Sequence, residues 1–270
     1  MSQENVIAQD KVIVIVGVGP GLGTAIPRRF AREGFSVGLI ARKAANLEAA
    51  KAVIEAEGGK VAGAVGAKVA GAVGAKVAGA VGAKVAIAEG DASDGVSLKK
   101  AFDALRGEVG DPSVLVYNAG AFVRAPLMEL TEEQLVDSWR IGCLGAFLSA
   151  QQVLPDMVAK GRGTILLTGA TGSMRGSANF ACMAVSKFGL RALGQSMARE
   201  FGPQGIHVAH VIVDGQINNP RTRERFGTTD RPEDTFLDTE AMADTYWHLH
   251  AQHKTSWAQE IDLRPSMEKF

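Results

Sequence analysis

The stretch "KVIVIVGVGPGLG" (Lys11–Gly23) decides the fold, because it joins an apolar strand to a glycine-rich turn. After Lys11 come five β-branched apolar residues, which is typical of a strand covered on both faces, as in a parallel sheet. In the turn, Gly17, Gly21 and Gly23 have the spacing G-x-x-x-G-x-G. Such glycines let the backbone turn tightly and approach a pyrophosphate at the N-terminus of the next helix. The alternative is a glycine-rich turn that binds no ligand.

Strand and helix patterns alternate on both sides of this stretch. Further strands are predicted at 36–41, 85–91, 112–120, 163–170, 206–215 and 259–263. Helices are predicted at 24–34, 46–59, 96–110, 131–159 and 180–202. Glycines end the first two helices, and Thr131 with Gln134 forms a capping box at the start of the fourth. The order predicts the α/β class, with a doubly wound parallel sheet of the Rossmann type in three layers, α/β/α. The ligand is expected at the carboxyl ends of the strands, where the strand order reverses.

Composition limits the classes of partner. The 270 residues include 29 basic and 29 acidic side chains, so no net charge favours nucleic acid or an anionic membrane. Cys143 and Cys182 are too few for a disulfide framework, which favours a reduced, cytoplasmic protein. No secretory signal or membrane span is recognised. We expect one domain over residues 1–270.

A perfect repeat interrupts the connection between the second helix and the third strand. The octapeptide "GAVGAKVA" is written three times between Gly63 and Ala86. Valines recur every four residues, which winds around a helix but falls on one face of a strand. We therefore expect an extended surface excursion, inserted into an otherwise ordinary helix-to-strand connection.

The end of the second strand indicates which dinucleotide binds. Folds that prefer NAD usually place an acid there to bind the adenosine ribose. Here Ala41 is followed by Arg42 and Lys43, and two cations suit a ribose 2′-phosphate, hence NADP. The alternative is that both are solvated charges at a helix start.

At this point the chain resembles the short-chain dehydrogenases/reductases over nearly its whole length outside the repeat. The resemblance rests on the glycine spacing, on Asp91 in "EGDASD", on "NAG" (Asn118–Gly120) and on "SK" (Ser186–Lys187). It implies a seven-stranded Rossmann sheet, a small-molecule substrate, and homodimers or homotetramers built on the two long helices. The cofactor-binding residues that it implies, with those found above, are Gly17, Gly21, Leu22, Gly23, Arg42, Lys43, Asp91, Asn118, Ala119, Gly120 and Lys187.

The resemblance fails at most of the residues that perform the family's chemistry. The family's catalytic set is an Asn, a Ser, a Tyr and a Lys, and here Lys187 alone is retained. The Tyr position, four residues before the Lys, is Met183, and the Ser position, thirteen residues earlier, is Ala170. The Asn position, three residues before Gly145, is Gly142. Lys187 can still hold the nicotinamide ribose, or it can be an ordinary helix lysine whose amine reaches solvent.

The chemistry lost is proton transfer and binding of the carbonyl oxygen. Met183 has no exchangeable proton, and Ala170 has no polar side-chain atom. Ser173, Cys182 and Tyr117 are substitute acids by position, although each is better explained as a packing or surface residue. The family's Pro-Gly after the sixth strand is here Asp214–Gly215.

Two clusters of basic residues are candidates either for binding sites or for solvated surface. His248, His250 and His253 lack an acid or cysteine at ligand spacing, so no metal site is expected. Arg221, Arg223 and Arg225 follow the sixth strand, where the family keeps a mobile substrate loop. They suit an acidic substrate, or they are solvated loop charges.

The sequence therefore predicts an NADP(H)-linked oxidoreductase of unknown substrate. The first alternative is a dinucleotide-binding protein that has lost catalysis. The second is an inert carrier for the octapeptide repeat, which would serve as an interaction or assembly segment.

Overall fold

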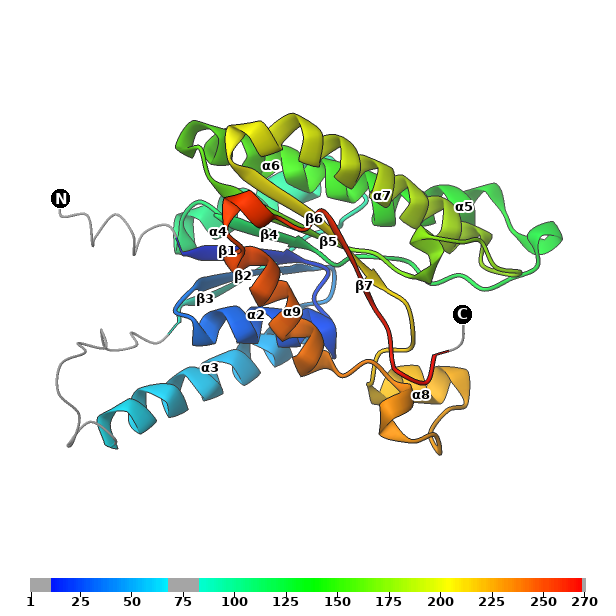
Figure 1. Ribbon diagram of the computed structural model, residues 1–270, viewed down its shortest axis with the longest axis horizontal. Helices are drawn as coiled ribbons and strands as arrows, with labels where there is room; N and C mark the ends of the chain where they lie inside the picture. The colour runs from blue at the N-terminus through cyan, green and yellow to red at the C-terminus, as the bar shows by residue number, and fades with distance from the viewer. Residues whose placement is uncertain (1–10, 68–82, 269–270) are drawn as a thin grey trace.

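One parallel sheet organises the part of the chain that the computed structural model describes, residues 11–67 and 83–268. Seven strands pair in the order β3-β2-β1-β4-β5-β6-β7, and every pairing is parallel (Figure 1). The order reverses between β1 and β4, so their carboxyl ends form the switch point at which such sheets bind ligands. The strands are β1 (Val12–Val16), β2 (Ser36–Ala41), β3 (Val85–Glu89), β4 (Val114–Tyr117), β5 (Gly163–Thr168), β6 (Ile206–Val213) and β7 (Glu260–Leu263).

Helices cover both faces of this sheet, which confirms the predicted α/β class and three layers. In Figure 1, α2, α3 and α9 lie below the sheet, while α6 and α7 lie above it. The helices are α2 (Leu22–Arg32), α3 (Ala44–Ala67), α4 (Gly95–Val109), α5 (Glu132–Trp139), α6 (Gly145–Lys160), α7 (Ala181–Phe201), α8 (Pro220–Phe226) and α9 (Thr239–Ala251).

The alternating side chains of each central strand supply two separate cores. Ile13 and Ile15 of β1 pack with α2 and α9, whereas Val14 and Val16 pack with residues of α4, α6 and α7. All four side chains are almost completely buried. This explains why β1 has no polar position, because a strand covered on both faces has no solvent side.

The predicted end of the second helix at Gly58 and Gly59 is wrong. Helix α3 continues through both glycines to Ala67, so the first five residues of the repeat, 63–67, are helical. Alanine has the highest helix propensity, and it outweighs a cost of about 1 kcal/mol for each glycine. The last two repeat residues, Val85 and Ala86, belong to β3. Residues 68–82, on which the extended excursion was expected, lie outside the described residues.

The predicted helix 131–159 contains an irregular turn. The capping box of Thr131 and Gln134 is confirmed, and it begins α5. Between α5 and α6, residues Arg140–Leu144 form a π-helical turn. Such turns are rare and often occur at functional sites.

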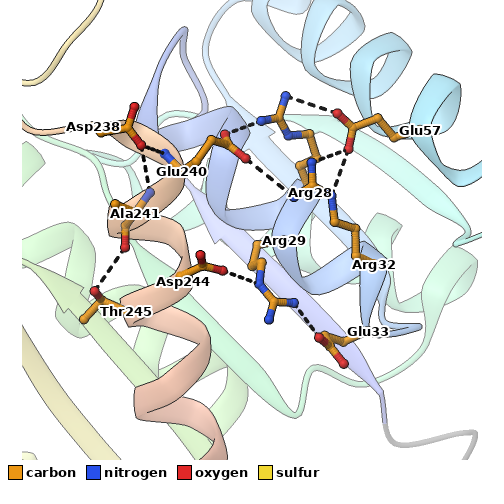
Figure 2. A network of polar contacts seen from close by, with 10 residues as sticks. All are labelled: Arg28, Arg29, Arg32, Glu33, Glu57, Asp238, Glu240, Ala241, Asp244 and Thr245. Atoms are coloured by element: carbon orange, nitrogen blue, oxygen red, sulfur yellow. Dashed lines mark hydrogen bonds and ion pairs between the residues drawn. The ribbon is translucent and has the colours of Figure 1, made fainter. Parts of the chain in front are cut away.

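An ion-pair network attaches α9 and α3 to α2 (Figure 2). Arg28 contacts both Glu57 of α3 and Glu240 of α9, and Arg32 contacts the same two carboxylates. Arg29 adds a bond from its Nε to Asp244 at 2.6 Å. The network fixes the helix that follows the glycine turn against two neighbours. Over the described ranges, no helix is long and apolar enough to cross a membrane.

Candidate functional site

A cleft of about 690 Å³ opens at the carboxyl edge of the sheet. It is formed by the loops after β1, β2, β3, β4 and β6, together with Thr168 at the end of β5. Its volume lies within the range of small-molecule and cofactor sites, about 300–1,000 Å³. The cleft therefore lies where the strand order reverses, as the sequence predicts for a ligand.

The floor of the cleft is the glycine turn, and its geometry requires glycine. Gly17 has a φ of +98°, and a Cβ there would lie 2.4 Å from the backbone nitrogen of Ala119. A Cβ on Gly23 would lie 2.9 Å from the carbonyl oxygen of Gly17. Asn118 donates from Nδ2 to that same oxygen at 2.9 Å. The ends of β1 and β4 are therefore in direct backbone contact, and the turn leaves room above it for a ligand.

Cations mark the end of the cleft beside β2. Arg42 and Lys43 line the cleft and are exposed, directly after the buried Ala41. Asp91, after β3, also lines the cleft, and its charge interacts with that of Arg42. Burial raises the pKa of its carboxyl, but hydrogen bonds from the backbone and hydroxyl of Ser93 and the charge of Arg42 lower it by more, so the net shift is downward. Asp91 is therefore ionised at neutral pH.

Most of the predicted cofactor residues meet in this cleft. Those that line it are Gly17, Leu22, Gly23, Arg42, Lys43, Asp91, Asn118, Ala119 and Gly120. Gly21 and Lys187 do not line it. Gly21 instead supports the turn, with a φ of +89°.

Lys187 lies beneath the cleft wall. Its Nζ donates to the carbonyl oxygen of Thr168 at 2.8 Å. A Cβ on Gly120 would lie 3.5 Å from this Nζ, and both Gly120 and Thr168 line the cleft. Lys187 is 8% exposed, and burial lowers the pKa of its amine to about 8. Lys187 is thus a buried lysine that is separated from the cleft by Thr168 and Gly120, and its amine does not extend to solvent.

The positions compared with the family's Asn, Ser and Tyr are apolar or tightly packed. Met183 is half-buried beside Gly172, whose added Cβ would lie 3.0 Å from its Cγ. Ala170 precedes the short 3₁₀ turn Thr171–Ser173. Gly142 lies in the π-helical turn, and a Cβ there would lie 1.9 Å from the Oγ of Ser186 on α7. Any larger residue at position 142 would therefore displace the hydroxyl of Ser186.

The three substitute acids are all buried and none lines the cleft. Ser173 and Tyr117 are 0% exposed, and Cys182 is 1% exposed. The Oγ of Ser173 accepts from the backbone nitrogen of Ala170 and contacts Nε2 of His210, both at 3.2 Å. Tyr117 donates its hydroxyl to the carbonyl oxygen of Ile141, and burial raises its pKa above the usual range. These contacts agree with packing roles.

Asp214, where the family has a proline, is a structural residue that the sequence did not reveal. It is 1% exposed, and it pairs with Arg175 at 3.2 Å and with Arg264 at 2.8 Å. Thr171 also donates to it at 2.6 Å. The carboxylate therefore ties the loop after β5 to the loops after β6 and β7.

Arginines of α8 also reach the cleft. Arg221 and Arg225 line it, as do Asn219 and Thr222. The prediction placed these arginines in a substrate loop and left their role open. Their i, i+4 spacing after a strand end is the sequence signal for a shared face of a helix.

The histidines form no metal site. Helix α9 ends at Ala251, so His253 does not share a helix face with His250. His250 is packed against Phe30 and Phe35 at 5.5 and 5.3 Å, with Nδ1 2.9 Å from the hydroxyl of Thr164. Within residues 11–67 and 83–268, no group of three or more potential ligands is close enough to hold a metal ion.

Comparisons with known proteins agree with this architecture. Residues 53–235 match a family described as enoyl-(acyl carrier protein) reductase, and residues 11–72 match short chain dehydrogenase. A short-chain dehydrogenase/reductase of Armillaria gallica is 30% identical over 217 residues, which are 79% of this chain and 74% of that protein.

Solved structures match over nearly the whole chain. The short-chain dehydrogenase from Rhodopseudomonas palustris is 31% identical, with a TM-score of 0.72 over 94% of this chain and 98% of that one. An alcohol dehydrogenase from Thermococcus sibiricus, solved with 5-hydroxy-NADP, has a TM-score of 0.77 over 96% and 98%. At 23% identity, this second likeness shows the fold alone.

Proposed function

Because the chain belongs to the short-chain dehydrogenase/reductase family of oxidoreductases, we propose that it binds NADP(H) in the cleft and lacks the usual proton donor. The observation that carries the proposal is the cleft itself, with glycine turn, carboxyl strand ends and two cations at the adenosine end. Dinucleotides lie in this place in Rossmann sheets, with the pyrophosphate at the N-terminus of the first helix.

The charge at the end of β2 supports NADP over NAD. The described residues after β2 offer Arg42 and Lys43 and no acid before Glu48. An acid would bind the two ribose hydroxyls, whereas an arginine fork matches a 2′-phosphate. The Thermococcus sibiricus enzyme, which has the same fold, was solved with an NADP derivative.

The test of cofactor preference is a fluorescence titration with NADPH and NADH. We expect at least about tenfold tighter binding of NADPH, since a hydrogen bond to a charged group contributes about 1.5–3 kcal/mol. Arg42→Ala should weaken NADPH binding about 10- to 100-fold and leave NADH binding within about twofold. Arg199→Ala, an exposed cation near the end of α7, is the matched control. Equal wild-type affinities for the two cofactors would refute NADP preference.

The bound cofactor supplies a hydride, and the chain must supply a place for the carbonyl and a proton for its oxygen. Lys187 and Asn118 shape the wall and floor of the cleft through their bonds to Thr168 and Gly17. Met183 and Ala170 contribute no proton and no hydrogen bond to a carbonyl oxygen. Positioned acid–base catalysis typically contributes 10²–10⁴-fold, so slow reduction of simple ketones is expected.

A dinucleotide-binding protein without catalysis is the second candidate. The absence of an exchangeable side-chain proton at Met183 favours it for any ordinary carbonyl reduction. The two candidates differ in one measurable quantity, which is the rate of NADPH oxidation above background when a carbonyl compound is added.

A homo-oligomer built on the long helices is also part of the proposal. Large apolar side chains are exposed on α5, α6 and α7, which lie together on one side of the sheet (Figure 1). They are Leu135, Trp139, Phe147, Val185 and Phe188, with exposed fractions of 37% to 49%. Exposed apolar patches of this kind mark protein interfaces, and a second copy of the chain offers a matching surface.

Sedimentation velocity tests this interface. The wild type is expected to sediment as a dimer or tetramer, and Phe147→Glu with Phe188→Glu should shift it toward the monomer. Val96→Glu, an exposed apolar residue on α4, is the control and should leave the distribution unchanged. A monomeric wild type at micromolar concentration would contradict the proposal.

A further inference from the structure

Helix α8 begins directly against the glycine turn. A Cβ on Gly21 would lie 3.5 Å from Nδ2 of Asn219. Asn219 is the N-cap of α8, since its Oδ1 accepts from the backbone nitrogen of Thr222 at 2.9 Å. The start of α8 is therefore fixed beside the part of the turn where a pyrophosphate is expected.

The three arginines of α8 divide between two faces. Arg221 and Arg225 are four residues apart, so they share one face of the helix, and both line the cleft. Arg223 does not line the cleft: its Nε donates to Oδ1 of Asn218 at 3.0 Å, and its guanidinium lies 4.2 Å from the ring centre of Phe236. Arg223 stabilises the loop, whereas Arg221 and Arg225 are available to a ligand.

An aromatic contact holds Arg225 at the cleft. Its guanidinium lies 4.7 Å from the ring centre of Phe122, which also lines the cleft. Phe122 is in turn packed edge-on against Phe226 of α8, with ring centres 5.6 Å apart. The N–H groups of an arginine lie in the plane of its guanidinium. An aromatic ring on the face of that plane therefore leaves them free to bind an anion.

The positive charge of this pair is not offset by any ion pair within the described part of the chain. No carboxylate of the described residues forms an ion pair with Arg221 or Arg225. Asp91 is the acid that lines the cleft, and it lies beside Arg42. The cleft thus has cations at two separate places, one after β2 and one on α8.

We propose that Arg221 and Arg225 bind the diphosphate of the dinucleotide, across from the glycine turn. The inference rests on the proposed function, because it requires a dinucleotide in the cleft. The adenosine-end cations Arg42 and Lys43 match the 2′-phosphate. The N-terminus of α2 offers the diphosphate backbone N–H groups but no cationic side chain, so cations for its two charges come from α8. Arginine forks bind phosphate oxygens through paired N–H groups, and the diphosphate is shared by NADPH and NADH.

Titration of both cofactors against two kinds of variant tests the assignment. In Arg221→Ala/Arg225→Ala, NADPH and NADH should both bind about 10- to 100-fold more weakly, with their affinity ratio unchanged. Arg42→Ala should change that ratio. The double variant should also lose part of the salt dependence of binding, because two charges no longer meet the phosphates.

Arg124→Ala is the matched control. Arg124 lies over the ring of Phe180 at 5.8 Å, much as Arg225 lies over Phe122, but it does not line the cleft. It should change both affinities by less than about twofold. If it weakens binding as much as the double variant does, the effect is one of general charge, and the assignment is wrong.

Further outcomes separate this inference from the proposed function. Unchanged affinity for both cofactors in a folded double variant would overturn the inference and leave the proposed function intact. The inference would also be overturned, with the proposed function intact, if the double variant changed only the KM for an acidic substrate. A wild type that binds neither dinucleotide would overturn both. If the alanine variant does not fold, Arg221→Lys/Arg225→Lys keeps the charge without the fork and is expected to show a smaller loss for both cofactors.

Discussion

Lys187 shows how one residue combines a familiar position with an unusual environment. Its amine is bonded to the carbonyl oxygen of Thr168 and is almost completely buried. Burial lowers its pKa to about 8, and the neighbouring thiol of Cys143 opposes this shift. The amine therefore titrates close to neutral pH. Keeping it charged in this buried position lowers the stability of the folded protein.

This pKa predicts a pH dependence of folding. Since the pKa is about 8 when folded and 10.5 when unfolded, the unfolded chain binds more protons between these values. The contribution of Lys187 to the free energy of unfolding should therefore rise with pH from 8 to 10.5, by up to about 1.4 kcal/mol per pH unit. Urea unfolding at several pH values should show this rise for the wild type relative to Lys187→Met.

Lys99→Met is the control for this measurement, because Lys99 is an exposed lysine on α4. For this variant, the free energy of unfolding plotted against pH should run parallel to that of the wild type. If the Lys187→Met curve is also parallel, the amine titrates normally and is not desolvated as the structure indicates.

At the scale of elements, the helix that follows β2 differs most from its prediction. The sequence placed its end at two consecutive glycines, but α3 continues to Ala67. Local stop signals fail here because alanine-rich flanks favour helix on both sides of the glycines. The third copy of the octapeptide supplies the first two residues of β3, whereas the first five residues of the first copy are helical.

We predict that the repeat can be deleted without loss of the fold. Removing Gly63–Ala86 joins Ala62 to Ile87, so Val61 and Ala62 take the places of Val85 and Ala86 at the start of β3. Loop length costs little, about 0.6 kcal/mol per doubling. Calorimetry should show a melting temperature within about 2–4 °C of the wild type, with unchanged NADPH affinity.

The deletion has a clear contrary result. A variant that remains unfolded, or that no longer binds NADPH, would mean that residues 63–86 support the sheet or the cleft. The helix-to-strand connection would then be part of the architecture.

At the scale of the whole molecule, local patterns predicted the sheet and the floor of the cleft. β1 and the glycine turn are contiguous in sequence, and the requirement for glycine at 17 and 23 follows from backbone contacts that the spacing already implies. The carboxyl edge of a parallel sheet then places Arg42, Asp91 and Asn118 together. These residues were predictable because each lies within two residues of the end of a strand.

Contacts between distant loops were not predictable in this way. Asp214 stands where the family has a proline, but its pairing with Arg175 and Arg264 joins three loops far apart in sequence. The burial of Ser173 beside His210 depends likewise on how β5 and β6 pack. Such contacts depend on tertiary packing, which a single sequence without paired substitutions does not specify.

If the proposed function holds, the molecule keeps the cofactor cleft of its family and lacks its proton donor. The most direct measurement is steady-state NADPH oxidation with simple ketones, for the wild type and for Met183→Tyr/Ala170→Ser. We expect very weak wild-type turnover, a rise of about 10²-fold or more in kcat/KM for the double variant, and unchanged NADPH affinity in both. Robust wild-type turnover that survives replacement of Ser173, Cys182 and Tyr117 would contradict this expectation, because another group would then be supplying the proton.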